Sequence, residues 1–189
     1  TEMTGGSDIR ERVGAVFFAV VMVTSIMAVG FTGTAAAADG DGLKSVDTVT
    51  APNIEVAQSD TTQTIDVQYT HERSKNDKET VEVDLDNQVS GPASIISVSN
   101  LQVTGDTSDV TVNNLQTTSS GGNVDGYTFD TEQTSGTDPQ VTVSVDVLYD
   151  TTGQSTTGGQ TVTAKDGNGQ TATASPSFVD NPMDLVSSE

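Results

Sequence analysis

The fold is decided by the stretch Val141-Thr142-Val143-Ser144-Val145-Asp146-Val147-Leu148-Tyr149. Every odd-numbered position in it is Val or Tyr, and three of the four positions between them are polar. An apolar period of two is that of a β-strand with one buried side, whereas a helix needs apolar residues three or four apart. We therefore predict a half-buried strand over 141–149.

The same alternation recurs along most of the chain after residue 43. Strong runs cover 65–69 and 81–86, and weaker runs cover 46–50, 54–57, 95–103, 110–115 and 127–129. Two last runs, 161–164 and 171–174, flank the turn-rich linker 165–170, which is typical of a tight hairpin. No window after residue 40 has a helical period. The pattern predicts an all-β sandwich of about 8–10 strands over 39–179, either immunoglobulin-like or a jelly roll.

Three segments lack the strand pattern. The composition of 117–124 and 151–160, rich in Gly, Ser and Thr, predicts flexible loops. The tail 180–189 contains Pro182, and its Met183, Leu185 and Val186 are available to dock on the body or on a neighbour. We find no internal repeat in the sequence.

The chain from residue 39 to 189 is strongly acidic. It holds 24 Asp and Glu residues but only five Lys and Arg residues, so its net charge is −19 with the histidine neutral. Such a charge repels itself in dilute salt, whereas molar salt shortens the Debye length to about 3 Å and screens the repulsion. The composition is that of a chain kept soluble in brine. Intrinsic disorder is the alternative, since only about 20% of these residues are Leu, Ile, Val or Phe, but their regular alternation favours a fold.

The N-terminal segment has the layout of a secretory signal. Arg10 and Arg12 precede 21 uncharged residues, 13–33, and the small-residue run 34–38 follows. Cations, an apolar stretch and an Ala-x-Ala site, here with Ala35 and Ala37, predict a signal peptide over 1–38 with cleavage near Ala37 or Ala38. An uncleaved anchor is the alternative, because about 20 residues suffice to cross a bilayer. Arg10-Glu11-Arg12 lacks the paired arginines of the twin-arginine route.

This segment also resembles a known type of signal. The runs IRERVGAVFFAVVMVTS (9–25) and FTGTAAA (31–37) are similar to the signal peptide of haloarchaeal surface glycoproteins. The resemblance covers about 37 residues and implies export to, or beyond, the surface of a salt-loving archaeon. It implies no role in a surface lattice. The sequon Asn-x-Ser/Thr is absent from the chain, which departs from the resemblance and leaves only Ser/Thr-linked sugar open.

The candidate chemistry is sparse. His71 is the only histidine, and its charged surroundings, 71–79, predict a solvated loop residue without a catalytic role. The cations Arg73, Lys75 and Lys78 in the same segment form a possible docking loop for an acidic neighbour; the alternative is a solvated tip whose cations pair with Glu72, Asp77 and Glu79. Cysteine is absent, so disulfides and thiol chemistry are excluded.

No metal, cofactor or nucleic-acid site is predicted. Calcium, which prefers oxygen ligands, is the only plausible ion. The tightest carboxylate clusters are Asp39 with Asp41 and Asp106 with Asp109, and neither has the spacing of a calcium loop. Nucleic acid is disfavoured because phosphate binding needs clustered cations.

These features predict an exported, non-catalytic structural or interaction protein of a haloarchaeal cell surface or its surroundings. Its expected partners are other surface proteins or copies of itself, with membrane contact only through an uncleaved N-terminal segment. One variant is a filament or pilus subunit in which a strand over 46–57 pairs with a sheet edge of the next copy. The alternatives are a secreted binding module for sugar or Ca²⁺, and a hydrolase built on two carboxylates.

Overall fold

The computed structural model of the protein describes residues 43–72, 78–89 and 91–180. The predicted signal segment with its hydrophobic helix, Arg73 and Lys75 of the docking loop, and the tail from residue 181 lie outside the described residues. Within the described ranges the chain forms eleven strands and one short 3-10 helix, η1(Asp86–Val89). The all-β prediction is confirmed.

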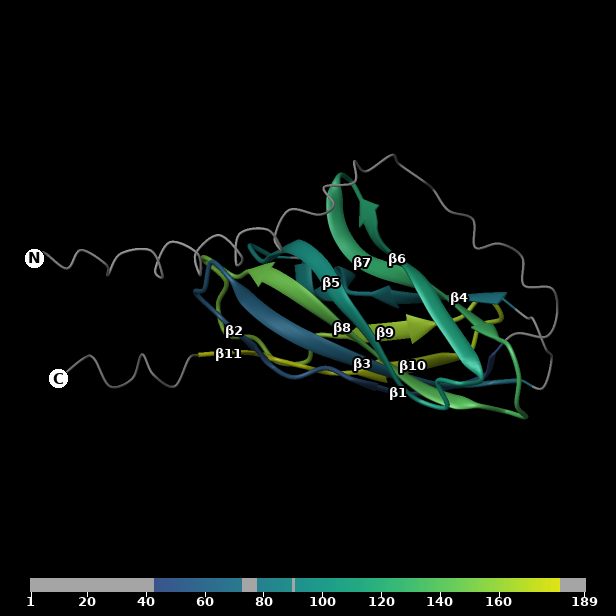
Figure 1. Cartoon of the computed structure of the whole chain (residues 1–189). Helices are drawn as coiled ribbons and strands as arrows, with labels where there is room; N and C mark the ends of the chain where they lie inside the picture. The colour runs from purple at the N-terminus through teal and green to yellow at the C-terminus, as the bar shows by residue number, and fades with distance from the viewer. Residues whose placement is uncertain (1–42, 73–77, 90, 181–189) are drawn as a thin grey trace, which may run out of the picture. The chain divides into compact units, whose positions relative to one another are not determined.

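Two main sheets lie alongside each other (Figure 1). The first sheet has four strands in the order β1(Leu43–Thr50), β3(Thr61–His71), β8(Gln140–Asp150) and β5(Ser94–Gly105). The second sheet has five strands in the order β10(Thr171–Ala174), β9(Val162–Lys165), β4(Lys78–Asp84), β7(Asn123–Gln133) and β6(Val110–Ser120). A third, minimal sheet pairs β2(Ile54–Glu55) with β11(Phe178–Val179) in parallel. All pairs in the two main sheets are antiparallel.

The connections wrap the chain around the core. The links β3–β4, β5–β6 and β7–β8 each cross from one main sheet to the other. As a result β3 and β8 pair in the first sheet, and β4 and β7 pair in the second. An immunoglobulin domain instead places strands A, B, E and D in one sheet. The strand order favours the jelly-roll alternative among the two that the sequence left open.

The core lies between the two main sheets, and Val supplies half of the 24 apolar residues that are buried in the described ranges. From Val141 to Tyr149 each odd-numbered side chain is 1% exposed or less. Burying a Val side chain contributes about 1.5–3 kcal/mol. All five aromatic residues in the described ranges are among the buried side chains: Tyr69, Tyr127, Phe129, Tyr149 and Phe178.

One loop prediction is wrong and a second is confirmed. Residues 117–124 form the end of the β6–β7 hairpin, with only Gly121 and Gly122 in the turn. Both glycines have positive φ, 62° and 91°, as a two-residue hairpin turn of type I′ requires. Composition misled here because Ser and Thr suit the outward side of a strand as well as a loop. The segment 151–160 does lack a strand, apart from a bridge between Thr157 and Phe178.

Candidate functional site

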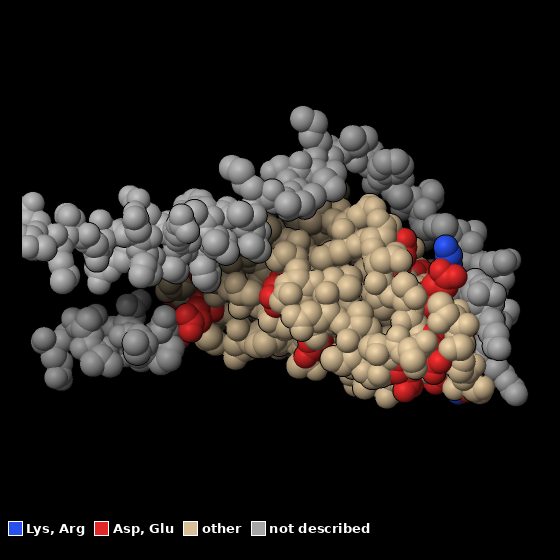
Figure 2. All heavy atoms as spheres, in the orientation of Figure 1, with Lys and Arg blue, Asp and Glu red and all other residues tan. Residues whose placement is uncertain are grey.

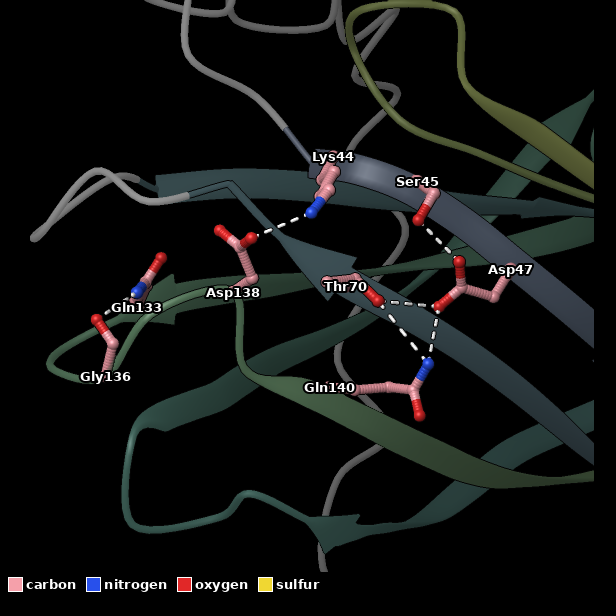
Figure 3. A network of polar contacts seen from close by, with 8 residues as sticks. All are labelled: Lys44, Ser45, Asp47, Thr70, Gln133, Gly136, Asp138 and Gln140. Carbon is pink, nitrogen blue, oxygen red and sulfur yellow. Dashed lines mark hydrogen bonds and ion pairs between the residues drawn. The ribbon is translucent and has the colours of Figure 1, made fainter.

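A group of linked polar side chains lies on the outer side of the first sheet (Figure 3). Its centre is Asp47 on β1. The register of β1 against β3 skips Asp47, because Val46 faces Tyr69 and Thr48 faces Gln68. Asp47 is therefore the extra residue of a β-bulge, and the bulge turns its carboxylate toward the neighbouring strands.

The carboxylate of Asp47 collects three hydrogen bonds. It accepts them from the Ser45 hydroxyl (2.5 Å), the Thr70 hydroxyl (2.8 Å) and the Gln140 side-chain amide (3.0 Å). Partial burial pushes the pKa of Asp47 upward, but these hydrogen bonds and the charge of Lys44 outweigh it, so the net pKa is lowered. Asp47 thus ties the outer strand β1 to both β3 and β8.

Lys44 and Asp138 form an ion pair at the same end of the first sheet. Lys44 Nζ lies 2.7 Å from Asp138 Oδ2, and both side chains remain partly exposed. This hydrogen bond and the carboxylate charge raise the pKa of Lys44. Beside them, the side-chain amide of Gln133 donates to the backbone oxygens of Ser135 and Gly136 (3.0 and 3.2 Å), and this holds the turn after β7 (Figure 3).

Substituting Asp47 is expected to loosen β1. Asp47→Ala removes three acceptor interactions at an exposed site, and we expect a loss of about 1 kcal/mol in the free energy of unfolding, measured by urea titration. Because the pKa of Asp47 is lowered, the loss is full near neutral pH and shrinks as the pH falls through that lowered pKa. Asp60→Ala, at an exposed carboxylate between strands, is the matched control. Equal effects of the two substitutions would contradict the role of Asp47 in holding β1 to β3 and β8.

His71 is buried, and the prediction that it is a solvated loop residue is wrong. It is 1% exposed, because β3 continues to residue 71 and the alternation that buries Val67 and Tyr69 also buries His71. Its Nε2 lies 2.8 Å from the hydroxyl of Thr131 on β7, and the Tyr69 hydroxyl donates to the same oxygen at 2.8 Å. A hydroxyl both donates and accepts, so the Thr131 hydroxyl bonds the Tyr69 hydroxyl and the histidine ring at the same time.

Burial sets the protonation of this group. Removal from water lowers the pKa of His71 to about 4 and raises that of Tyr69, so both side chains are neutral at pH 7. A buried histidine whose Nε2 contacts a core threonine cannot reach a substrate as a general base. We therefore assign the Tyr69–Thr131–His71 cluster to the architecture of the core.

A second buried polar cluster lies at the other end of the sandwich. The Tyr149 hydroxyl is within hydrogen-bond distance of the side-chain oxygens of Gln63 and Gln88, at 3.2 and 2.5 Å. The amide of Gln63 also donates to the backbone oxygen of Pro52 at 2.5 Å. These bonds attach η1 and the segment before β2 to the core. Nearby residues 89, 91–95 and 122–124 line an open hollow of about 400 Å³, and none of them is charged.

Lys78 is the only predicted docking residue within the described ranges. Its Nζ lies 3.4 Å from Glu132 on the paired strand β7, and its side chain is 74% exposed. This ion pair forms because the antiparallel register sets Lys78 opposite Glu132. The local pairing expected for Arg73 and Lys75 lies outside the described residues. The described residues do not bring a second cation to Lys78.

Asp106 and Asp109, the described carboxylates considered as calcium ligands, already accept hydrogen bonds from other residues of the protein. Asp106 Oδ2 accepts from the backbone N–H of Gln140 at 2.9 Å, and Asp109 accepts from the Ser135 hydroxyl. The two carboxylates therefore bind the β5–β6 loop to the segment between β7 and β8 and to the start of β8. Over the described part of the chain, no three His, Cys, Asp or Glu side chains gather as metal ligands would. Asp39 and Asp41 precede the described residues.

A repeated feature that sequence reasoning missed lies on the two outer strands β5 and β6. The tripeptide Asn-Leu-Gln occurs at 100–102 and again at 114–116, and both asparagines have φ of 57°. Asn100 Nδ2 donates to Asp146 at 2.7 Å, and Asn114 Nδ2 donates to Asp130 at 2.7 Å. The shared tripeptide was the available signal, but three residues are too short to stand out from a polar sequence.

Comparison with known protein families, with curated proteins and with solved structures gives no significant match. In the portion of the chain that the structure describes, no helix has the length and hydropathy needed to span a membrane. The site therefore has to be interpreted from its own geometry.

Proposed function

We propose that the protein is an exported, non-catalytic component of a haloarchaeal cell surface or extracellular structure, and that it works by contact. The supporting observation is chemical. In the described residues the histidine and every aromatic side chain are buried, while the outer sides of the sheets carry hydroxyls, amides and carboxylates that bond one another. Such a surface offers neither a nucleophile with its base nor an aromatic platform for a sugar.

The charge of the surface supports the proposed setting. Figure 2 shows Asp and Glu distributed over the visible side and gathered toward one end, with few basic atoms among them. The full chain carries a net charge of −20. A surface of this kind repels nucleic acid and other copies of itself in dilute salt, and it tolerates close approach only when salt screens it.

The direct test is the intact mass and location of the protein in the organism that makes it. We expect it in the envelope or the medium, with a mass that lacks the first 37 or 38 residues. A full-length chain in the cytosol would overturn the proposal. Extra mass in steps of a hexose would indicate Ser/Thr-linked sugar on a protein that is still exported.

A further inference from the structure

The outer strands β5 and β6 leave one backbone edge of each main sheet without a strand partner in the described residues. They are long strands, of 12 and 11 residues. An outer strand of this length is a template for pairing with another chain, and natural proteins blunt it with bulges and charges. How these two edges are treated therefore bears on how the protein meets its neighbours.

Each edge carries the same interruption. On β5, Ser99 pairs with Asp146 and Gln102 with Ser144, so Asn100 and Leu101 together face the single residue Val145. On β6, Asn113 pairs with Asp130 and Gln116 with Thr128, so Asn114 and Leu115 together face Phe129. One extra residue opposite one partner is a β-bulge, which bends the strand and unpairs it locally.

The asparagine is the inserted residue in both cases. If Asn100 is set aside, Ser99, Leu101, Gln102 and Val103 alternate regularly, with Leu101 and Val103 half-buried and the other two exposed. The same holds on β6 for Asn113, Leu115 and Gln116. The left-handed backbone at each asparagine is one that Asn tolerates better than most residues.

Matching side-chain bonds fix both bulges. Asp146 accepts from Asn100 on one side (2.7 Å) and from Thr64 of β3 on the other (2.6 Å). In the second sheet, Asp130 accepts from Asn114 (2.7 Å) and from Thr80 of β4 (2.9 Å).

The glutamine of each tripeptide completes the arrangement. Gln102 donates to Asn100 at 3.1 Å, and Gln116 donates to Asn114 at 2.7 Å. Four residue types thus occupy equivalent places in two different sheets.

We propose that the Asn100 and Asn114 bulges prevent β5 and β6 from pairing with the edge of a second copy of this chain. This goes beyond the proposed function, because it determines which surface is left for contact. With these two bulges in place, strand addition at the long outer strands β5 and β6 is blocked. The opposite edges of the two sheets are the shorter strands β1 and β10, of 8 and 4 residues. Copies then meet through the polar sheet faces, the loops or these short strands. The chain would then stay a separate unit in the high salt that removes charge repulsion.

The test is to delete the inserted residues. In about 3 M KCl, where charge repulsion is screened, the parent protein is expected to have the mass of one chain by light scattering. Deleting Asn100 removes the central bulge of β5, although the bulge at Ile96 remains, and should give dimers. Deleting Asn114 should do the same on β6. Deleting both should give assemblies larger than dimers. Circular dichroism and a cooperative melt establish that each variant is folded.

Asn100→Gly with Asn114→Gly is the matched control. Glycine keeps the left-handed backbone and hence the bulge while losing the amide, so this variant should remain a single chain. Asn100→Val with Asn114→Val keeps the chain length but disfavours the bulge, and it serves if the deletions prevent folding; it should self-associate. Folded deletion or Val variants that keep the mass of one chain would overturn the proposal, as would equal association of the Gly control. Neither outcome bears on export, which the intact mass tests separately.

Discussion

The protein is expected to lose most of its stability when KCl is lowered from about 3 M to about 0.1 M, where the Debye length grows from under 3 Å to about 10 Å. Residues 39–189 carry a net charge of −19. Half of the buried apolar residues in the described ranges are Val, and the largest aromatic, Trp, is absent from the sequence. A domain's total stability is only about 5–15 kcal/mol. We expect a loss of several kcal/mol, measured as the urea midpoint at a series of KCl concentrations.

A charge-reduced variant separates screening from other effects of salt. Glu72→Gln with Asp180→Asn neutralises two exposed carboxylates that form no hydrogen bond or ion pair with the described residues. Glu72 contributes only weakly to the charge around Lys44, after Asp138. It should raise the midpoint in low salt and leave the midpoint in 3 M KCl within about 0.5 kcal/mol of the parent. A parent protein that is equally stable at both salt concentrations would refute the brine-adaptation argument and remove one support of the proposed setting.

Acid is expected to destabilise the protein through His71. The folded pKa is about 4, whereas the unfolded value is about 6.5, so between these values the unfolded chain binds a proton that the folded chain does not. The stability that His71 provides is complete above pH 6.5 and decreases as the pH falls toward 4. The loss amounts to about 2–3 kcal/mol at the lower limit.

The single histidine makes this prediction easy to measure. Its ring signal in NMR should not titrate between pH 8 and 5 in the folded protein, and it should titrate near 6.5 in urea. Because carboxylates also begin to titrate at the lower end of this range, His71→Leu serves as the reference. Its stability should depend less on pH between 6.5 and 4 than that of the parent. A folded-state midpoint near 6.5 would contradict the buried, neutral assignment.

Thr131→Val tests the same cluster at constant pH. The substitution keeps the shape of the side chain but leaves the Tyr69 hydroxyl and His71 Nε2 without their observed partner, and a buried polar group left unpaired costs about 1–3 kcal/mol. We expect a loss of about 3 kcal/mol. Thr80→Val, at a half-buried site where the hydroxyl bonds Asp130, should cost less.

The sequence by itself determined the strands. Alternation with a period of two located the long strands, because a strand with one buried side imposes that period locally. The apolar positions of 141–149 are buried as predicted. The salt-rich setting, inferred from the acidic composition, and the signal peptide, inferred from the N-terminal layout, stay predictions. They concern the solvent and a segment outside the described residues.

Only the tertiary structure decided which polar residues matter. His71 reads as a loop residue because it opens a charged segment, yet pairing with β1 extends β3 through it and turns it inward. Asp47, Asn100 and Asn114 read as ordinary polar strand residues. Their role depends on β1, β5 and β6 being the outer strands of their sheets, which long-range pairing decides. A residue's neighbours along the chain carry no information on which strand lies beside it, so periodicity gave the sides of each strand but not the edges of the sheets.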